Sequence, residues 1–181
     1  NLSRSDIPPG LRSHLAEWGP RLRRETDTAA SLRGLGMPTH QLRVGTDCSG
    51  LDAPVFALNA MNLPGGVRHL FSSEVNSKKR MFVEANHPNA TIYPDMVRRD
   101  HSSLPQHDLY VCGFPCKPFS LLHVGSKGFR EKAARPFRAV IRTLREQLPP
   151  VAVLENVGGI RRVLDRVHQE LHSLGWYEIL T

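Results

Sequence analysis

The 181-residue sequence has few cysteines and no long apolar run, and these absences exclude several classes of protein. Three cysteines are too few, and odd in number, for a disulfide framework, which favours a reducing compartment. The apolar stretch at residues 151–154 is far too short to cross a bilayer, so we expect no membrane partner. No basic and apolar leader opens the sequence, so we expect no secretory signal.

A metal site is not expected either. Cys112 and Cys116 lie near His107 and His123, but their spacing is not that of a zinc finger. The sequence offers no second cysteine pair to complete such a site.

Acidic residues are also scarce, because 17 Asp and Glu stand against 24 Lys and Arg. The formal net charge is +7, and arginine supplies 19 of the 24 basic residues. The guanidinium group matches phosphate oxygens, which favours a nucleic-acid partner. An ordinary solvated surface explains the charge equally well. The content of 40% hydrophobic and 23% charged residues is typical of one globular domain.

The first 40 residues differ from the rest in composition. Prolines and glycines interrupt them, and Leu11, Leu15 and Trp18 recur at helical spacing before a basic end. We therefore expect a basic, Pro/Gly-interrupted tail or linker at 1–40 with one short amphipathic helix, and a folded domain at 41–181.

From residue 41 onward, short apolar runs alternate with amphipathic segments, a pattern typical of βαβ units. Strands are expected at 42–48, 67–75, 91–93, 108–112, 151–154 and 176–180. Helices are expected at 52–61, 77–86, 131–147 and 160–174. The predicted fold class is α/β, with a mostly parallel sheet and helices on both faces.

Chemically unusual residues follow four of these strands, and ligands bind outside the carboxyl ends of parallel strands. They are Ser49-Gly50, Glu74, Gly113 to Cys116, and Glu155-Asn156. A glycine directly after the first strand permits a sharp turn, and an acid after the next strand can accept hydrogen bonds from ribose hydroxyls. A plain βαβ turn with a solvent-facing glutamate fits the same spacing.

Cys116 is the candidate nucleophile. Pro115 and Pro118 fix the backbone on both sides of it, and the charge of Lys117 favours the thiolate. The alternative is an inert buried cysteine. Glu155 ends a strand, where it can act either as an acid of raised pKa or as a cap of the next helix.

The segments GFPCKPFS at 113–120 and VLENVGG at 153–159 closely resemble the nucleophile and acid motifs of the DNA (cytosine-5) methyltransferases. TDCSGL at 46–51 resembles the S-adenosylmethionine loop of that family. SSEVN at 72–76 resembles the segment whose acid takes the cofactor ribose.

Asp100-His101 resembles the segment whose aspartate takes the adenine amino group. The resemblance covers residues 42–181 and implies a Rossmann-like S-adenosylmethionine-dependent methyltransferase fold. It also implies that this part of the catalytic domain stops before the target-recognition domain.

The resemblance implies that Cys116 adds to carbon 6 of a cytosine flipped out of double-stranded DNA. Glu155 would hold and protonate ring nitrogen 3, and carbon 5 would then take the methyl group of S-adenosylmethionine. The implied cofactor-binding residues are Cys48, Ser49, Gly50, Leu51, Glu74, Val75, Asp100, His101 and Pro115.

Three further residues are implied to support the pocket. Asn156 would orient the loop that carries the nucleophile. Phe119 and Ser120 would begin a mobile loop that closes over DNA.

The sequence departs from the family pattern in its cofactor loop. The family has an aromatic residue where Cys48 stands and a second glycine where Asp52 stands. Pro136 replaces a leucine that touches the cofactor, and Lys117 replaces a glutamine. We expect Asp52 to add bulk and negative charge near the methionine end of the cofactor.

Two other functions remain open, a tRNA cytosine-5 methyltransferase and a catalytically dead regulatory domain of the same fold. We expect the missing C-terminal part of the same protein to read the target sequence, and this piece alone to be inactive. An intracellular location with DNA follows, in the nucleus of a eukaryote or the cytoplasm of a bacterium.

Overall fold

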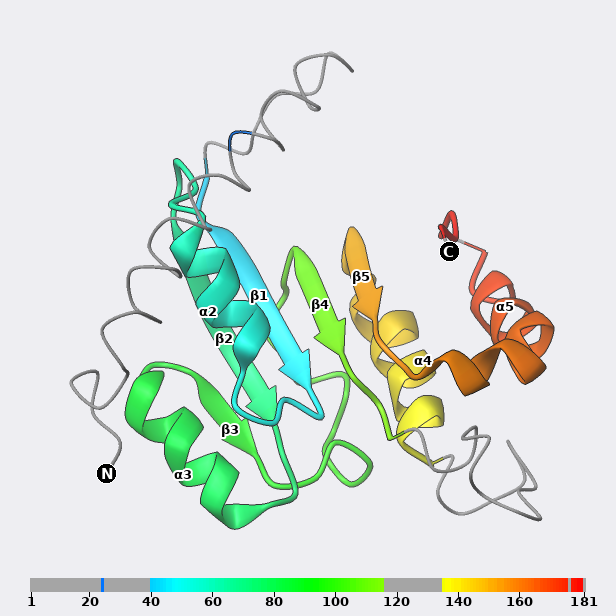
Figure 1. Cartoon of the computed structure of the whole chain (residues 1–181), viewed down its shortest axis with the longest axis horizontal. Helices are drawn as coiled ribbons and strands as arrows, with labels where there is room; N and C mark the ends of the chain where they lie inside the picture. Colours follow the sequence, from blue (N-terminus) through cyan, green and yellow to red (C-terminus); the bar gives the residue numbers. More distant parts are fainter. Residues whose placement is uncertain (1–23, 25–39, 116–134, 176, 181) are drawn as a thin grey trace.

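The structure is a computed structural model that describes residues 24, 40–115, 135–175 and 177–180. Within this part, five parallel strands form one sheet in the order β3-β2-β1-β4-β5 (Figure 1). The strands are β1 (Leu42–Asp47), β2 (Val67–Ser73), β3 (Thr91–Tyr93), β4 (Leu109–Cys112) and β5 (Val151–Leu154). The order reverses between β1 and β4, which places a topological switch point at their carboxyl ends.

The helices lie on both faces of the sheet, as the alternating sequence pattern predicts. They are α2 (Ala53–Ala60), α3 (Ser77–Asn86), α4 (Arg135–Gln147), the 3₁₀ helix η4 (Gly158–Val163) and α5 (Leu164–His172). Figure 1 shows α2 in front of β1 and β2, and α4 behind β4 and β5. No helix in the described part of the chain is both long and apolar enough to cross a membrane.

Two sequence predictions about the last described segments are wrong in part. The helix predicted over 160–174 is α-helical only over 164–172, because η4 precedes it in a stretch that opens with two glycines. Residues 177–180 lie outside any strand. Tyr177 instead donates its hydroxyl proton to the carbonyl of Pro149 at 3.0 Å, and Ile179 packs on the core.

Two strand ends also differ from the predicted bounds. β1 stops at Asp47 because Cys48 adopts a left-handed backbone conformation with φ 51°. β2 stops at Ser73, so Glu74 and Val75 belong to the loop that follows. The predicted helix residues 131–134 and the predicted N-terminal helix, apart from Arg24, lie outside the described residues.

The main core lies between the sheet and the two helices α4 and α5. Phe71 on β2 crosses directly over Gly45 on β1, where any Cβ atom would overlap its ring. The core side chains are mostly aliphatic and aromatic: Phe71, Tyr110, Cys112, Phe114, Phe137, Val140, Ile141, Leu144, Val167, Leu171 and Leu174.

A buried ion pair crosses this core at the carboxyl end of β1. Arg99 donates to both carboxylate oxygens of Asp47, and its side chain is only 3% exposed. Tyr110 on β4 donates to the same carboxylate at 2.6 Å. Arg99 also donates to Ser73 at the end of β2 and to Thr143 on α4, at 2.5 and 3.0 Å. One guanidinium therefore joins β2 and α4 to the end of β1.

Replacing Arg99 by methionine should lower the free energy of unfolding by about 3–5 kcal/mol, because Asp47 would be left as an unpaired buried charge. Arg98→Met is the matched control. Its side chain is 88% exposed in a surface pair with Asp95, so the loss should stay below about 1 kcal/mol. Urea denaturation measures both values, and similar losses in the two variants would contradict the role of the buried pair.

Acid should destabilise the fold between about pH 6.5 and pH 4. Burial, aided by the charge of Arg99, lowers the pKa of His101 from 6.5 to about 4. In this window the unfolded chain therefore binds a proton that the folded chain does not. His101 alone should make the free energy of unfolding fall with decreasing pH by up to roughly 1.4 kcal/mol per unit, as measured by urea denaturation across the window.

His101→Gln should remove part of this pH dependence. The same substitution at His172, on the exposed surface of α5, is the control for the change of side chain itself. Burial also lowers the pKa of His69, His87 and His107, so a smaller slope should persist in His101→Gln. An unaltered slope in that variant would contradict the assignment.

Candidate functional site

The described segments that follow β1, β2, β4 and β5 lie at the carboxyl edge of the sheet, where the arrowheads of Figure 1 point. The turn at 48–52 follows β1 and leads into α2, and Glu74 follows β2. Phe114 and Pro115 follow β4, while Glu155 and Asn156 follow β5. The edge therefore has one half on β1 and β2 and a second half on β4 and β5.

The turn at 48–52 holds three left-handed residues within five positions. Cys48, Gly50 and Asp52 have φ angles of 51°, 59° and 58°. Ser49 anchors the turn to β2, because its hydroxyl oxygen accepts a hydrogen bond from Ser72 at 2.5 Å. Leu51 is half exposed at the rim.

Glu74 is joined to this turn by its carboxylate. Its Oε2 accepts from the backbone N–H of Gly50 at 2.9 Å, and its Oε1 accepts from the backbone N–H of Asn76 at 2.8 Å. Each oxygen keeps a further lone pair, so the carboxylate can still accept hydrogen bonds from a ligand. Val75 beside it is exposed.

Asp100 and His101 lie in different environments although they are adjacent in the chain. The Asp100 carboxylate is exposed and accepts from the backbone N–H and the hydroxyl of Ser102, which lowers its pKa and keeps it ionised. The His101 ring is buried and its Nδ1 lies 2.8 Å from the hydroxyl of Thr143 on α4. The ring of His101 therefore contacts α4.

The two described cysteines at this edge, Cys48 and Cys112, point their sulfur atoms toward the core. The Cys48 thiol lies 3.5 Å from the sulfur of Met96 and packs against the main core. Cys112 is fully buried at the end of β4, and burial raises its pKa well above the ordinary value. Cys112 is therefore a protonated core thiol rather than a nucleophile.

In the second half of the edge, hydrogen bonds join the segment after β4 to the segment after β5. Asn156 donates its side-chain amide to the carbonyl of Phe114 at 2.8 Å, and Glu155 donates its backbone N–H to the carbonyl of Cys112 at 3.0 Å. Phe114 is buried and packs on Phe137 of α4. These contacts hold the segment that leads to residue 116 from two sides.

The Glu155 carboxylate lies directly beside this segment. A methyl group on Gly113 would come to 3.2 Å from its Oε2 atom, which shows how closely the carboxylate approaches the loop. Glu155 and Pro115 are both exposed. Cys116, Phe119 and Ser120 lie outside the described residues, as do Lys117 and Pro118.

The sequence indicates no role for Arg99 and Tyr110, which bond to Asp47 at the end of β1, or for Thr143, which bonds to Arg99. Each is far from Asp47 in the sequence, so no local spacing indicates their contact. No group of three or more metal-ligating residues occurs in the described ranges.

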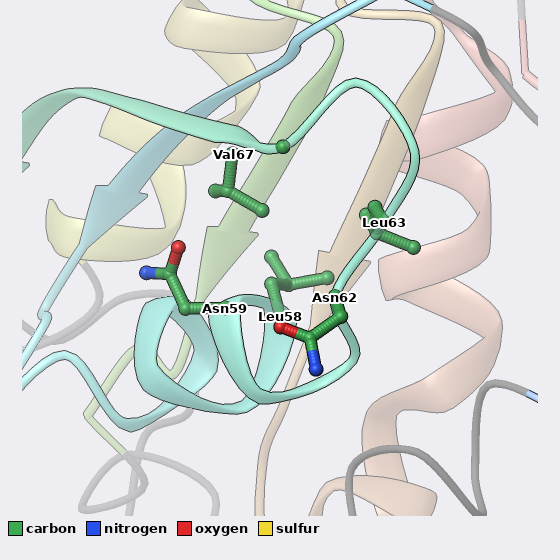
Figure 2. A pocket seen from close by; sticks show the side chains of 6 residues that line it. Leu58, Asn59, Asn62, Leu63 and Val67 are labelled. Atoms are coloured by element: carbon green, nitrogen blue, oxygen red, sulfur yellow. The ribbon is translucent and has the colours of Figure 1, made fainter.

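A shallow pocket lies at the opposite end of β2 and is unconnected with this edge. It has a volume of about 230 Å³ and is lined by Leu58, Asn59, Asn62, Leu63, Gly66 and Val67 (Figure 2). Val67 begins β2, so the pocket lies at the amino ends of the strands.

Comparison with known sequences gives a consistent result. The M.NlaX type II methyltransferase of Neisseria lactamica is 32% identical over 120 residues, which are 64% of this chain and 38% of that protein. The DNA (cytosine-5-)-methyltransferase DMT5 of Cryptococcus neoformans is 26% identical over 186 residues, which are 87% of this chain and 7% of that protein. The chain thus spans well under half the length of these curated relatives.

Solved structures show the same fold at lower identity. The Dnmt2 methyltransferase of S. pombe matches with a TM-score of 0.57 and 20% identity, over 74% of this chain and 41% of that one. A putative DNA modification methyltransferase from an E. coli prophage matches with a TM-score of 0.58 and 20% identity, over 77% of this chain and 40% of that one.

The sequence model of the C-5 cytosine-specific DNA methylases matches residues 48–180, which include the segments that follow β1, β2, β4 and β5. Because this match covers most of the chain and both halves of the edge, the chain belongs to the C-5 cytosine-specific DNA methylase family.

Proposed function

We propose that the protein transfers a methyl group from S-adenosylmethionine to carbon 5 of cytosine in double-stranded DNA. The observation that carries the proposal is the pair of contacts from Glu155 and Asn156 to the segment 112–114. They hold Glu155 beside the loop that continues into Cys116. The proposed reaction requires this, because Glu155 and Cys116 act on the same cytosine ring.

The first half of the edge fits the cofactor. Glu74 has acceptor capacity for two ribose hydroxyls, and its contact with Gly50 keeps the β1–α2 turn close to it. The ionised carboxylate of Asp100 can accept from an adenine amino group. Bound there, S-adenosylmethionine supplies an electrophilic methyl group carried on a sulfonium.

The second half supplies the covalent chemistry. The Cys116 thiolate adds to carbon 6 of the cytosine, while Glu155 donates a proton to ring nitrogen 3. This electron shift makes carbon 5 nucleophilic enough to accept the methyl group. Loss of the proton from carbon 5 to water restores the double bond and expels the Cys116 thiolate, and the proton on ring nitrogen 3 returns to Glu155.

DNA must present the base outside the helix, because stacking and pairing bury carbon 5 and carbon 6 in a duplex. The net charge of +7 supports a polyanionic substrate, since basic side chains neutralise phosphates. The exposure of Glu155 and Pro115 leaves room at the edge for such a base.

Cys116→Ser in the intact protein should lower kcat by at least about 10³-fold while DNA binding persists, because a hydroxyl cannot replace the thiolate. DNA containing 5-fluorocytosine should form a covalent complex that denaturing gel electrophoresis detects, and only when Cys116 is present. Cys112→Ala is the thiol control and should retain the complex, since the Cys112 thiol is buried and protonated. Methylation of tRNA but not DNA by the wild type would overturn the substrate assignment.

Glu155→Gln should lower kcat by about 10²–10³-fold, because an amide cannot donate the proton that activates the ring. The midpoint of thermal unfolding should change little, since the carboxylate is exposed. Glu84→Gln on the exposed surface of α3 serves as the control. A variant at Glu155 that keeps more than half of the wild-type kcat would exclude the acid role.

A further inference from the structure

Asp52 is the residue of the β1–α2 turn whose position differs most from expectation. From the sequence its charge is expected near the methionine end of the cofactor, but the side chain is completely buried. Its backbone is left-handed, with φ 58°, and it precedes α2 without capping the helix through its side chain. The carboxylate therefore turns inward, beneath the turn.

A chain of hydroxyl groups holds this carboxylate. Thr46, a buried residue of β1, donates to Asp52 Oδ1 at 2.6 Å. The Thr46 oxygen also lies 3.0 Å from the hydroxyl of Ser49, whose oxygen accepts from Ser72. Thr46 gives its single proton to Asp52, so its oxygen can only accept, and the single proton of Ser49 is within reach of both Thr46 and the carbonyl of Ser73 at 3.2 Å. The turn is thus bonded to β1 and β2 from within.

The other carboxylate oxygen faces two histidines. Asp52 Oδ2 lies 3.7 Å from His69 Nε2, which is 2.9 Å from the carbonyl of Phe71. The ring of His87 on α3 meets the ring of His69 edge-on at 4.8 Å. Burial lowers the pKa of both histidines, so the Asp52–Thr46 hydrogen bond is the contact that positions the carboxylate at neutral pH.

The turn needs such a contact because of its backbone. A left-handed conformation costs free energy for a residue with a Cβ atom, less for Asp and Asn than for most others, and glycine adopts it most readily. A buried carboxylate with a short hydrogen bond can hold Asp52 in this conformation, whereas a glycine would leave the turn free to move. The held turn presents the N–H of Gly50 to Glu74.

We propose that Asp52 is a positioning residue for the cofactor, and that its hydrogen bond with Thr46 fixes the turn at 48–52 in the shape that binds S-adenosylmethionine. The proposal rests on the proposed function, because it assigns the cofactor to this edge. It differs from a purely structural role in predicting that the bond controls cofactor affinity.

The test compares S-adenosylmethionine affinity by calorimetry across matched variants of the intact protein. Asp52→Ala and Thr46→Val remove the acceptor and the donor, and each should raise the Kd at least tenfold. The double variant should be no worse than the poorer single variant, because both changes break one bond. Asp52→Asn and Thr46→Ser keep an acceptor and a donor, and they should stay within threefold of wild type.

Asn62→Ala is the control for backbone strain. Asn62 lies just beyond the other end of α2 and also has a positive φ, of 50°, so alanine introduces comparable strain there without touching the turn. Its Kd should equal that of wild type. If Asp52→Ala fails to fold, the pair Thr46→Val and Thr46→Ser decides the question alone.

Hydrogen exchange without cofactor separates this proposal from the proposed function. The amides of residues 49–53 should exchange faster in Asp52→Ala and Thr46→Val than in wild type or Asn62→Ala. A wild type that does not bind S-adenosylmethionine would refute the proposed cofactor, yet faster exchange would still support the fixed turn. Unchanged exchange together with a Kd within twofold of wild type in both variants would overturn the inference.

Discussion

The ion pair between Arg99 and Asp47 fixes the carboxyl end of β1, and the functional edge is built outward from that point. A buried carboxylate is costly unless it is opposed by charge and fully hydrogen-bonded, and here Tyr110 completes the set. The same guanidinium reaches the end of β2 and α4 through Ser73 and Thr143. The turn at 48–52 begins at the next residue, so its origin cannot shift without breaking this network.

Much of the sheet follows from the sequence because its signals are local. Short apolar runs such as 108–112 and 151–154 are bounded by turn residues, and their alternation with helices implies a parallel sheet. The errors occur where a distant contact decides the structure. The segment 177–180 is rich in apolar residues, yet the hydroxyl of Tyr177 bonds to Pro149 and the segment forms no strand. Strand propensity is a weak guide without a neighbouring ladder.

The candidate site shows the same division. The edge positions of Glu74 and Glu155 follow from strand ends and spacing, because parallel strands bring their carboxyl ends together. The partner of Asp47 cannot be predicted in this way, since Arg99 lies 52 residues away and no sequence pattern links the two residues. The inward turn of Asp52 is equally hidden, because an aspartate at the start of a predicted helix indicates an exposed side chain. The buried Thr46 hydroxyl on the preceding strand and the His69 ring on β2 explain it.

Comparing the carboxylates of this edge separates structural acids from those available to a ligand. Asp47 is saturated by Arg99 and Tyr110, and Asp52 is buried against Thr46, so neither faces a substrate. Glu74 accepts only one backbone N–H at each oxygen, and the carboxylate of Glu155 is exposed beside the loop that leads to Cys116. A cofactor that offers hydroxyl groups and a base that accepts a proton need these two kinds of carboxylate. Burying Asp47 and Asp52 against internal partners keeps both away from a ligand, while Glu74 and Glu155 stay available at the edge where the proposed reaction uses them.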